Sequence, residues 1–123
     1  MFQVTNKQFH DLVNEALLTL PKEHVENLNN VAIIVEDIPS AEQRETLKLR
    51  GDQTLLGLYE GVPLSKRQGL QKTLPDKITL FKIPIQSMVN NLKELKEEIR
   101  HTLWHEIAHY YGLDHPAIKS LEE

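Results

Sequence analysis

The chain has 123 residues, 40% of them hydrophobic, and contains no cysteine. This size and composition predict a single domain over residues 1–123, and the missing cysteines exclude disulfides and any cysteine-ligated zinc or redox site. Fourteen basic and eighteen acidic residues give a formal charge of -4, which argues against nucleic acid as a partner, because phosphate binding usually leaves a basic surface.

The first predicted element is an amphipathic helix over residues 5–20, which Pro21 ends. Thr5 and Gln8 have the spacing of a capping box at its start. The apolar residues behind this cap recur at helical spacing and form one buried stripe: Phe9, Leu12, Val13, Ala16, Leu17 and Leu20.

No secretion signal is evident at the N-terminus, because it lacks a charged start and an apolar stretch. The longest apolar run, residues 31–35, is too short to cross a bilayer. We therefore expect a cytoplasmic protein of bacterial type that has no membrane partner.

A strand follows at residues 31–35, after a polar segment (22–30) that leaves a further short helical turn open. Its continuous apolar run is typical of a central strand covered on both faces. Residues 36–40 break this strand, and a short helix over residues 41–49 is expected to open at Ser40.

Two further strands and a long helix complete the predicted order. Residues 55–59 favour a strand that ends in a turn at 60–63, and residues 65–76 favour a surface loop. Residues 77–83 alternate polar and apolar and predict a third strand that Pro84 stops. The last helix should begin between residues 87 and 91 and run to residue 111, with one buried side: Leu92, Leu95, Ile99, Leu103 and Ile107. This order predicts an α+β fold with one small sheet.

The strongest functional signal is the motif H-E-x-x-H-x-x-G-x-x-H over residues 105–115. His105 and His109 lie one above the other on a helix, so both imidazoles can bind one zinc ion. Glu106 can reach a zinc-bound water without filling a coordination site. Gly112 can take the left-handed conformation that ends a helix and turns His115 toward the same ion. Three imidazoles and one open position are the ligand set of a catalytic zinc site.

Other histidines compete for the ligand role, and His101 does so most directly. It lies roughly 12 Å from His109 on a straight helix, so these two cannot share one ion. We choose His105 with His109, because this pair carries the adjacent glutamate and the glycine turn. His101 is expected at the surface or hydrogen-bonded behind the site, and His10 and His24 are expected to be solvated.

Several residues near the motif have two interpretations. Trp104 and Tyr110 are expected to pack in the core. Asp114 could accept a hydrogen bond from a ligand imidazole, or serve only as a turn residue. Glu122 is the substitute ligand if His115 does not reach the metal, and otherwise belongs with Glu123 to a frayed tail.

The predicted chemistry is hydrolysis. Zinc lowers the pKa of its bound water to roughly 7, Glu106 takes the proton as that water attacks a carbonyl, and the proton then passes to the leaving amine. Tyr59 and Arg67 are candidate donors to the developing oxyanion.

The residues over 102–112, together with the segments 58–64 and 74–81, resemble the minimal zincin-like family of short bacterial proteins, described as zinc metallopeptidases. The resemblance covers roughly residues 30–115. It implies a zincin-like fold, with a backing helix, a small twisted sheet of three or four strands whose edge strand follows the cleft, and a C-terminal active-site helix. It also implies one Zn²⁺ ion and a peptide or protein substrate.

Two departures from related groups narrow this hypothesis. The only methionines are Met1 and Met88, so the methionine turn that follows the third histidine in metzincins is missing. The end of the motif, Gly112 to His115, also resembles metal-dependent ribonucleases of rRNA maturation, whose motif usually lacks a glutamate at the position of Glu106. That glutamate and the acidic charge favour a peptidase over a single-strand endoribonuclease. A metal- or peptide-binding module without turnover is the third hypothesis.

Overall fold

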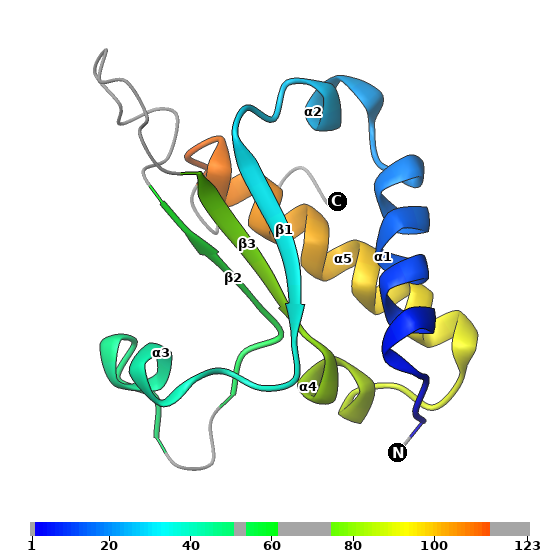
Figure 1. Ribbon diagram of the computed structural model, residues 1–123. Coiled ribbons are helices and arrows are strands. Elements are labelled where there is room, and N and C mark those ends of the chain that lie inside the picture. Colours follow the sequence, from blue (N-terminus) through cyan, green and yellow to red (C-terminus); the bar gives the residue numbers. More distant parts are fainter. Residues whose placement is uncertain (1, 51–53, 62–74, 114–123) are drawn as a thin grey trace.

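The computed structural model describes residues 2–50, 54–61 and 75–113 (Figure 1). The elements follow the order α1 (Asn6–Thr19), α2 (Lys22–Glu26), β1 (Val31–Glu36), α3 (Ala41–Thr46), β2 (Gly57–Glu60), β3 (Asp76–Phe81), α4 (Lys82–Ser87) and α5 (Leu92–Tyr110). The predicted α+β class is confirmed. The expected loop over residues 65–76 lies outside the described residues as far as residue 74, and its last residue, Asp76, begins β3.

The three strands form one mixed sheet in the order β1-β3-β2. Strand β3 pairs in parallel with β1 and antiparallel with β2. The prediction that residues 31–35 form the central strand is wrong, because β1 lies at one end of the three-stranded order and is only half-buried. The central strand is β3, and five of its six residues are buried. A continuous apolar run shows that a strand is largely covered, but it does not determine the order of strands.

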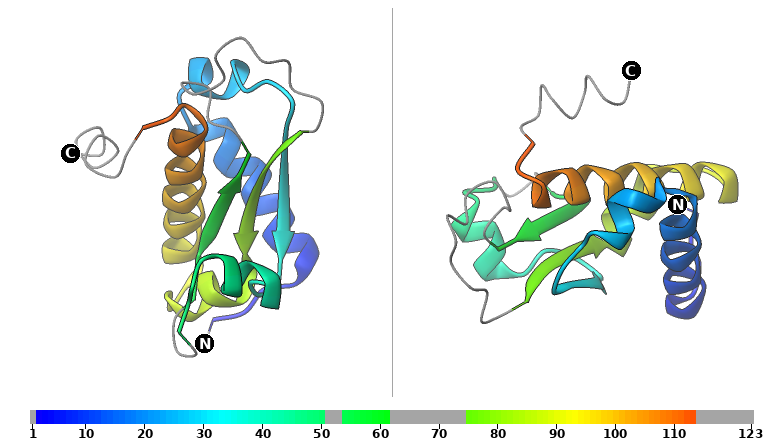
Figure 2. Two further views of the ribbon diagram at one scale, coloured as in Figure 1. Left: turned by 90° about the vertical axis from the view of Figure 1, so that its left-hand side faces the viewer. Right: turned by 90° about the horizontal axis from the view of Figure 1, so that it is seen from above.

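Helix α5 contacts β2 and β3 of the sheet and packs against α1, which lies on the same side of α5 as the sheet (Figure 2). The core lies where these elements meet. Phe9 and Val13 of α1 face Ile78 and Leu80 of β3 and the apolar residues of α5 within one buried cluster. The N-terminal helix therefore backs α5, as predicted.

Side chains that cap the helices fix where three of them begin. Thr5 accepts a hydrogen bond from the Gln8 amide at 3.1 Å, which confirms the predicted capping box of α1. Ser40 caps α3 in the same way, as expected, although α3 ends at Thr46 and not at residue 49. Asn91 accepts a hydrogen bond from the backbone of α5 and fixes the first residue of that helix as Leu92.

The third strand is shorter than predicted, because α4 begins directly after it. Lys82 and Ile83, expected in the strand, are the first two residues of this helix, and Pro84 is the third. Proline fits in the first helical turn, where the backbone N–H has no partner within the helix. Pro84 thus stops the strand by beginning a helix, which the sequence did not predict.

Helix α5 runs from Leu92 to Tyr110, close to the predicted range. Four of the five residues expected on its buried side have no exposed surface: Leu95, Ile99, Leu103 and Ile107. Leu92 is the exception at 46% exposed, because it lies at the first helical position, beyond the end of the core. Within the described residues, none of the helices is long and apolar enough to span a membrane.

Candidate metal centre

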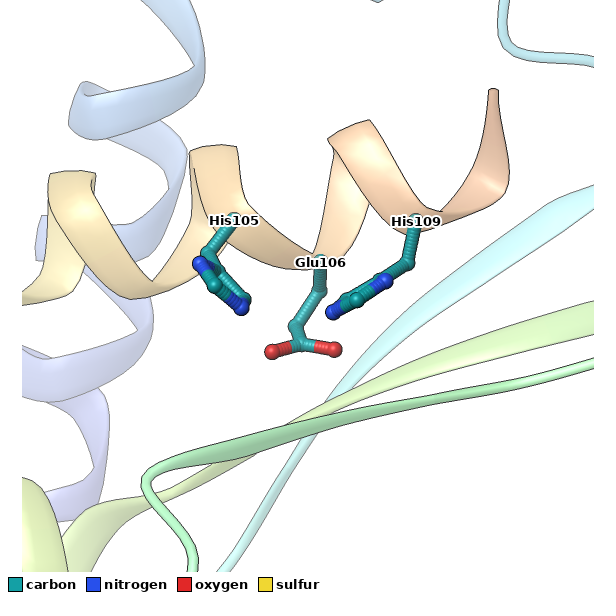
Figure 3. Close-up of side chains that lie close together, drawn as sticks. All are labelled: His105, Glu106 and His109. Atoms are coloured by element: carbon teal, nitrogen blue, oxygen red, sulfur yellow. The ribbon is translucent and has the colours of Figure 1, made fainter. Parts of the chain in front are cut away.

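His105, Glu106 and His109 lie close together on α5 and extend from the helix toward the strands (Figure 3). One ligand atom from each lies within 4.8 Å of the others. The imidazole rings of His105 and His109 have centroids 4.8 Å apart and an interplanar angle of 76°. This arrangement follows from the helical period, which places residues four apart on one face.

The donor chemistry of this group fits a zinc ion. Imidazole nitrogens and carboxylate oxygens are both common zinc ligands, with bonds of about 2.0–2.2 Å. Two nitrogens on one tetrahedral ion lie about 3.4 Å apart, so small side-chain rotations would bring the His105 and His109 nitrogens to one ion. Both histidines are half-buried, which leaves them accessible from solvent.

Glu106 is the most buried member, with 8% of its surface exposed. Burial raises the pKa of its carboxyl from 4.5 to about 7, because the charged form loses its hydration. A hydrogen bond from the Tyr59 backbone N–H acts in the opposite direction and lowers this pKa. The carboxyl therefore takes up and releases a proton near neutral pH, as a general base needs to do.

Helix α5 ends in a tight turn shortly after His109. Gly112 has a φ of 86°, in the left-handed region predicted for it. The Gly112 amide donates to the His109 carbonyl at 2.9 Å and the Leu113 amide to the Ala108 carbonyl at 3.1 Å. These two bonds form a Schellman motif, which satisfies the last carbonyls of the helix and reverses the chain direction. Arg67, Asp114, His115, Glu122 and Glu123 lie outside the described residues.

His101 does not join the group around His105. It is exposed, and its ring centroid lies 6.3 Å from that of His105, farther than His109 does. The geometry brings together the pair chosen from the sequence.

His24 was expected to be solvated, and this prediction is wrong. The residue is half-buried, with its ring 5.2 Å from that of Trp104 and 6.0 Å from that of Tyr111. Its backbone carbonyl accepts a hydrogen bond from the Tyr111 hydroxyl at 2.6 Å. Helix α2, which the sequence left open, brings His24 against the end of α5. His10 is exposed on α1, as predicted.

Trp104 and Tyr110 pack as predicted, since Trp104 borders the core and Tyr110 has no exposed surface. Tyr59 packs against Tyr110 with ring centroids 6.2 Å apart. Its hydroxyl, a candidate oxyanion donor, donates to Asp76 at 2.5 Å. Thus the Tyr59 hydroxyl is bound to a buried carboxylate, while its backbone N–H faces Glu106.

Two residues that contact Glu106 or Tyr59 were missed by sequence reasoning. Gly57 begins β2 and lies against Glu106, and Asp76 anchors Tyr59. Glycine within a predicted strand was an available signal, because it often marks a close approach of two backbones. Asp76 fell in a segment that was expected to be a loop.

The comparisons with known proteins agree with this geometry. A family model described as zincin-like metallopeptidase matches residues 28–123. A conserved hypothetical protein from T. thermophilus has a similar structure, with a TM-score of 0.56 and 20% sequence identity over 96% of this chain and 97% of that chain. At this identity the structural likeness supports the fold alone. The search of curated proteins found no match.

Proposed function

Because this chain belongs to the zincin-like metallopeptidase family, we propose that it is a zinc-dependent hydrolase that cleaves peptide bonds. His105 and His109 hold the ion, and Glu106 is the general base. His115 is proposed as the third ligand from its spacing in the motif. The observation that carries the proposal is the group of two imidazoles and one buried carboxyl, whose ligand atoms lie within 4.8 Å of one another.

A zinc ion bound here would supply a Lewis acid that makes water a nucleophile at neutral pH. Glu106 takes the proton from the attacking water and hands it to the departing amine. In the metal-free chain the pKa of its carboxyl is about 7, a value at which a carboxyl can both accept and release a proton near neutral pH. The Tyr59 N–H stabilises the ionised carboxyl, and the residues around Glu106 exclude bulk water from it.

The substrate proposed is a peptide or protein rather than a nucleic acid. The formal charge of -4 gives no excess of basic residues to neutralise phosphates. The Tyr59 hydroxyl would have to leave Asp76 before it could donate to an oxyanion, so we assign that residue's backbone, not its hydroxyl, to the site.

The test is cleavage of a mixture of unfolded peptides by the zinc-loaded protein and by Glu106→Gln. We expect the variant to bind zinc within about threefold of the wild type and to lose on the order of a thousandfold in kcat, because general-base catalysis contributes roughly 10²–10⁴. Glu97→Gln is the matched control, since Glu97 is an exposed glutamate on the same helix.

Three outcomes would contradict the proposal. In the first, Glu106→Gln cleaves peptides as fast as the wild type, which would remove Glu106 from the reaction. In the second, the zinc-loaded protein leaves peptides intact and cleaves single-stranded RNA instead, with a steep dependence on salt. Intact peptides and intact RNA together would indicate a binding module.

A further inference from the structure

The edge of β2 that does not pair with β3 faces the carboxyl of Glu106, the proposed general base. The Phe81 amide donates to the Leu56 carbonyl at 2.9 Å, so these two residues form a hydrogen-bonded antiparallel pair. Hydrogen-bonded and non-hydrogen-bonded pairs alternate along such a ladder. Gly57 and Tyr59, which pair with Leu80 and Ile78, are therefore non-hydrogen-bonded residues whose N–H groups point away from β3.

One of these outward groups is the donor to Glu106. The Tyr59 N–H donates to the Glu106 carboxyl. A side chain of α5 therefore accepts the hydrogen bond that the backbone of a neighbouring strand would accept in a larger sheet. Tyr59 itself is held firmly, because its hydroxyl donates to Asp76, which is 3% exposed, and its ring packs on Tyr110. The donor to Glu106 is thus fixed by contacts on the sheet side.

Gly57 allows this close approach of β2 to α5. A Cβ atom at Gly57 would lie 2.7 Å from Cγ2 of Thr102 and 3.2 Å from Cγ of Glu106. Its φ is not in the left-handed region, since the positive-φ glycines of the described chain are Gly61 and Gly112. Space between strand and helix, and not backbone conformation, therefore requires glycine at this position.

We propose that Gly57 is a positioning residue for the reaction: its missing side chain lets β2 approach α5 closely enough for the Tyr59 N–H to orient the Glu106 carboxyl. The consequence for catalysis rests on the proposed function, in which Glu106 is the base. The contact itself does not, because it is a property of the folded chain without metal or substrate.

The contact is tested by hydrogen exchange of the Tyr59 amide, measured by NMR on the metal-free protein. An outward amide on an edge strand normally exchanges quickly, but here we expect protection that Glu106→Ala reduces by at least about tenfold. The Thr79 amide, in a hydrogen-bonded pair with Leu58, is the internal control and keeps its protection. Equal Tyr59 exchange in wild type and Glu106→Ala would overturn the proposal.

The role of Gly57 is tested with Gly57→Ala and the double variant Gly57→Ala/Thr102→Ser. The alanine methyl should push β2 away, remove the Tyr59 protection and lower kcat on the order of a hundredfold, while zinc affinity stays within about threefold. Serine lacks the Cγ2 atom that the new methyl would meet at 2.7 Å, so the double variant should recover about tenfold of the loss. Thr102→Ser alone is the matched control.

Two results would overturn the positioning role. Either Gly57→Ala retains Tyr59 protection and full turnover, or it loses zinc affinity as much as turnover, which would indicate a distorted helix. If no peptide is cleaved even by the wild type, the proposed function fails, but the exchange experiment still decides whether Gly57 and Tyr59 hold Glu106.

Discussion

Two groups of residues on α5 differ in what they contribute to the protein. In the first, Leu95, Ile99, Leu103 and Ile107 are fully buried against α1 and the sheet. Beside them, on the same buried side, the helix carries the group around Glu106, whose buried carboxyl is destabilised in its charged form. Burying a leucine or isoleucine side chain contributes about 1.5–3 kcal/mol, so the apolar face can offset an unfavourable carboxyl on the same helix. The difference teaches that this site depends on a helix whose position is fixed by its buried apolar residues.

The largest effect on stability is expected from truncating one of the buried apolar side chains of α5. Leu103→Ala should lower the free energy of unfolding by about 2–5 kcal/mol, because it removes buried atoms and leaves a cavity. Urea denaturation at constant pH measures the loss. Leu92→Ala, at a position 46% exposed, should change stability by less than about 1 kcal/mol. Similar losses in the two variants would break the comparison.

The buried carboxyl of Glu106 should make the stability of the metal-free protein depend on pH. The pKa of Glu106 is about 7 in the folded chain and near 4.5 when unfolded, so the folded state holds this proton more tightly. Its stabilising contribution is fully present below pH 4.5 and is lost as the pH rises through 7, on the order of 3 kcal/mol in all.

This pH effect is isolated by comparison with Glu106→Gln, which keeps the shape of the side chain but does not titrate. Unfolding free energies of both proteins are measured in the presence of a chelator from about pH 4 to about pH 8, a range that spans both pKa values. The wild type should lose stability relative to the variant as the pH rises. A difference that stays constant with pH would show that the carboxyl is not destabilised by burial.

Zinc affinity should distinguish a histidine that binds the metal, His109, from one that does not, His101. His109→Ala should weaken zinc binding by roughly a hundredfold or more, because it removes a ligand. Residues that only hydrogen-bond to the ligands of a metal site already contribute about 10–100-fold to affinity, so the loss of a ligand should cost at least as much. His101→Ala should change affinity by less than about threefold, since His101 lies outside the ligand group. Competition with a chromophoric chelator gives both values. Equal losses would mean that His105 and His109 are not the ligand pair.

The smallest effect is expected where α2 holds the end of α5. Tyr111→Phe removes the hydrogen bond from the hydroxyl to the His24 carbonyl and should lower stability by about 1 kcal/mol. The ring contact with His24 remains in this variant, so the change isolates the hydroxyl. Thermal unfolding measures it, and an unchanged midpoint would mean that this bond does not hold the helix end.

Local signals made most of the secondary structure predictable. The capping residues Thr5 and Ser40 begin α1 and α3, where sequence spacing placed them. Helix α4 could not be predicted in the same way, because an alternating segment before Pro84 is equally typical of a strand. His24 was misjudged for a different reason: its polar neighbours indicate solvent, and only the packing of α2 on α5 brings it against Trp104.

The sequence by itself determined that His105, Glu106 and His109 share one face of a helix and that Gly112 turns the chain, because helical period and glycine conformation are local properties. Only the tertiary structure decided how that face is used. Within the described residues, placing β3 at the centre of the sheet makes β2 an edge strand, and Gly57 lets this edge approach Glu106. Strand order and close approach depend on contacts between segments far apart in the chain, and no short stretch of sequence specifies them.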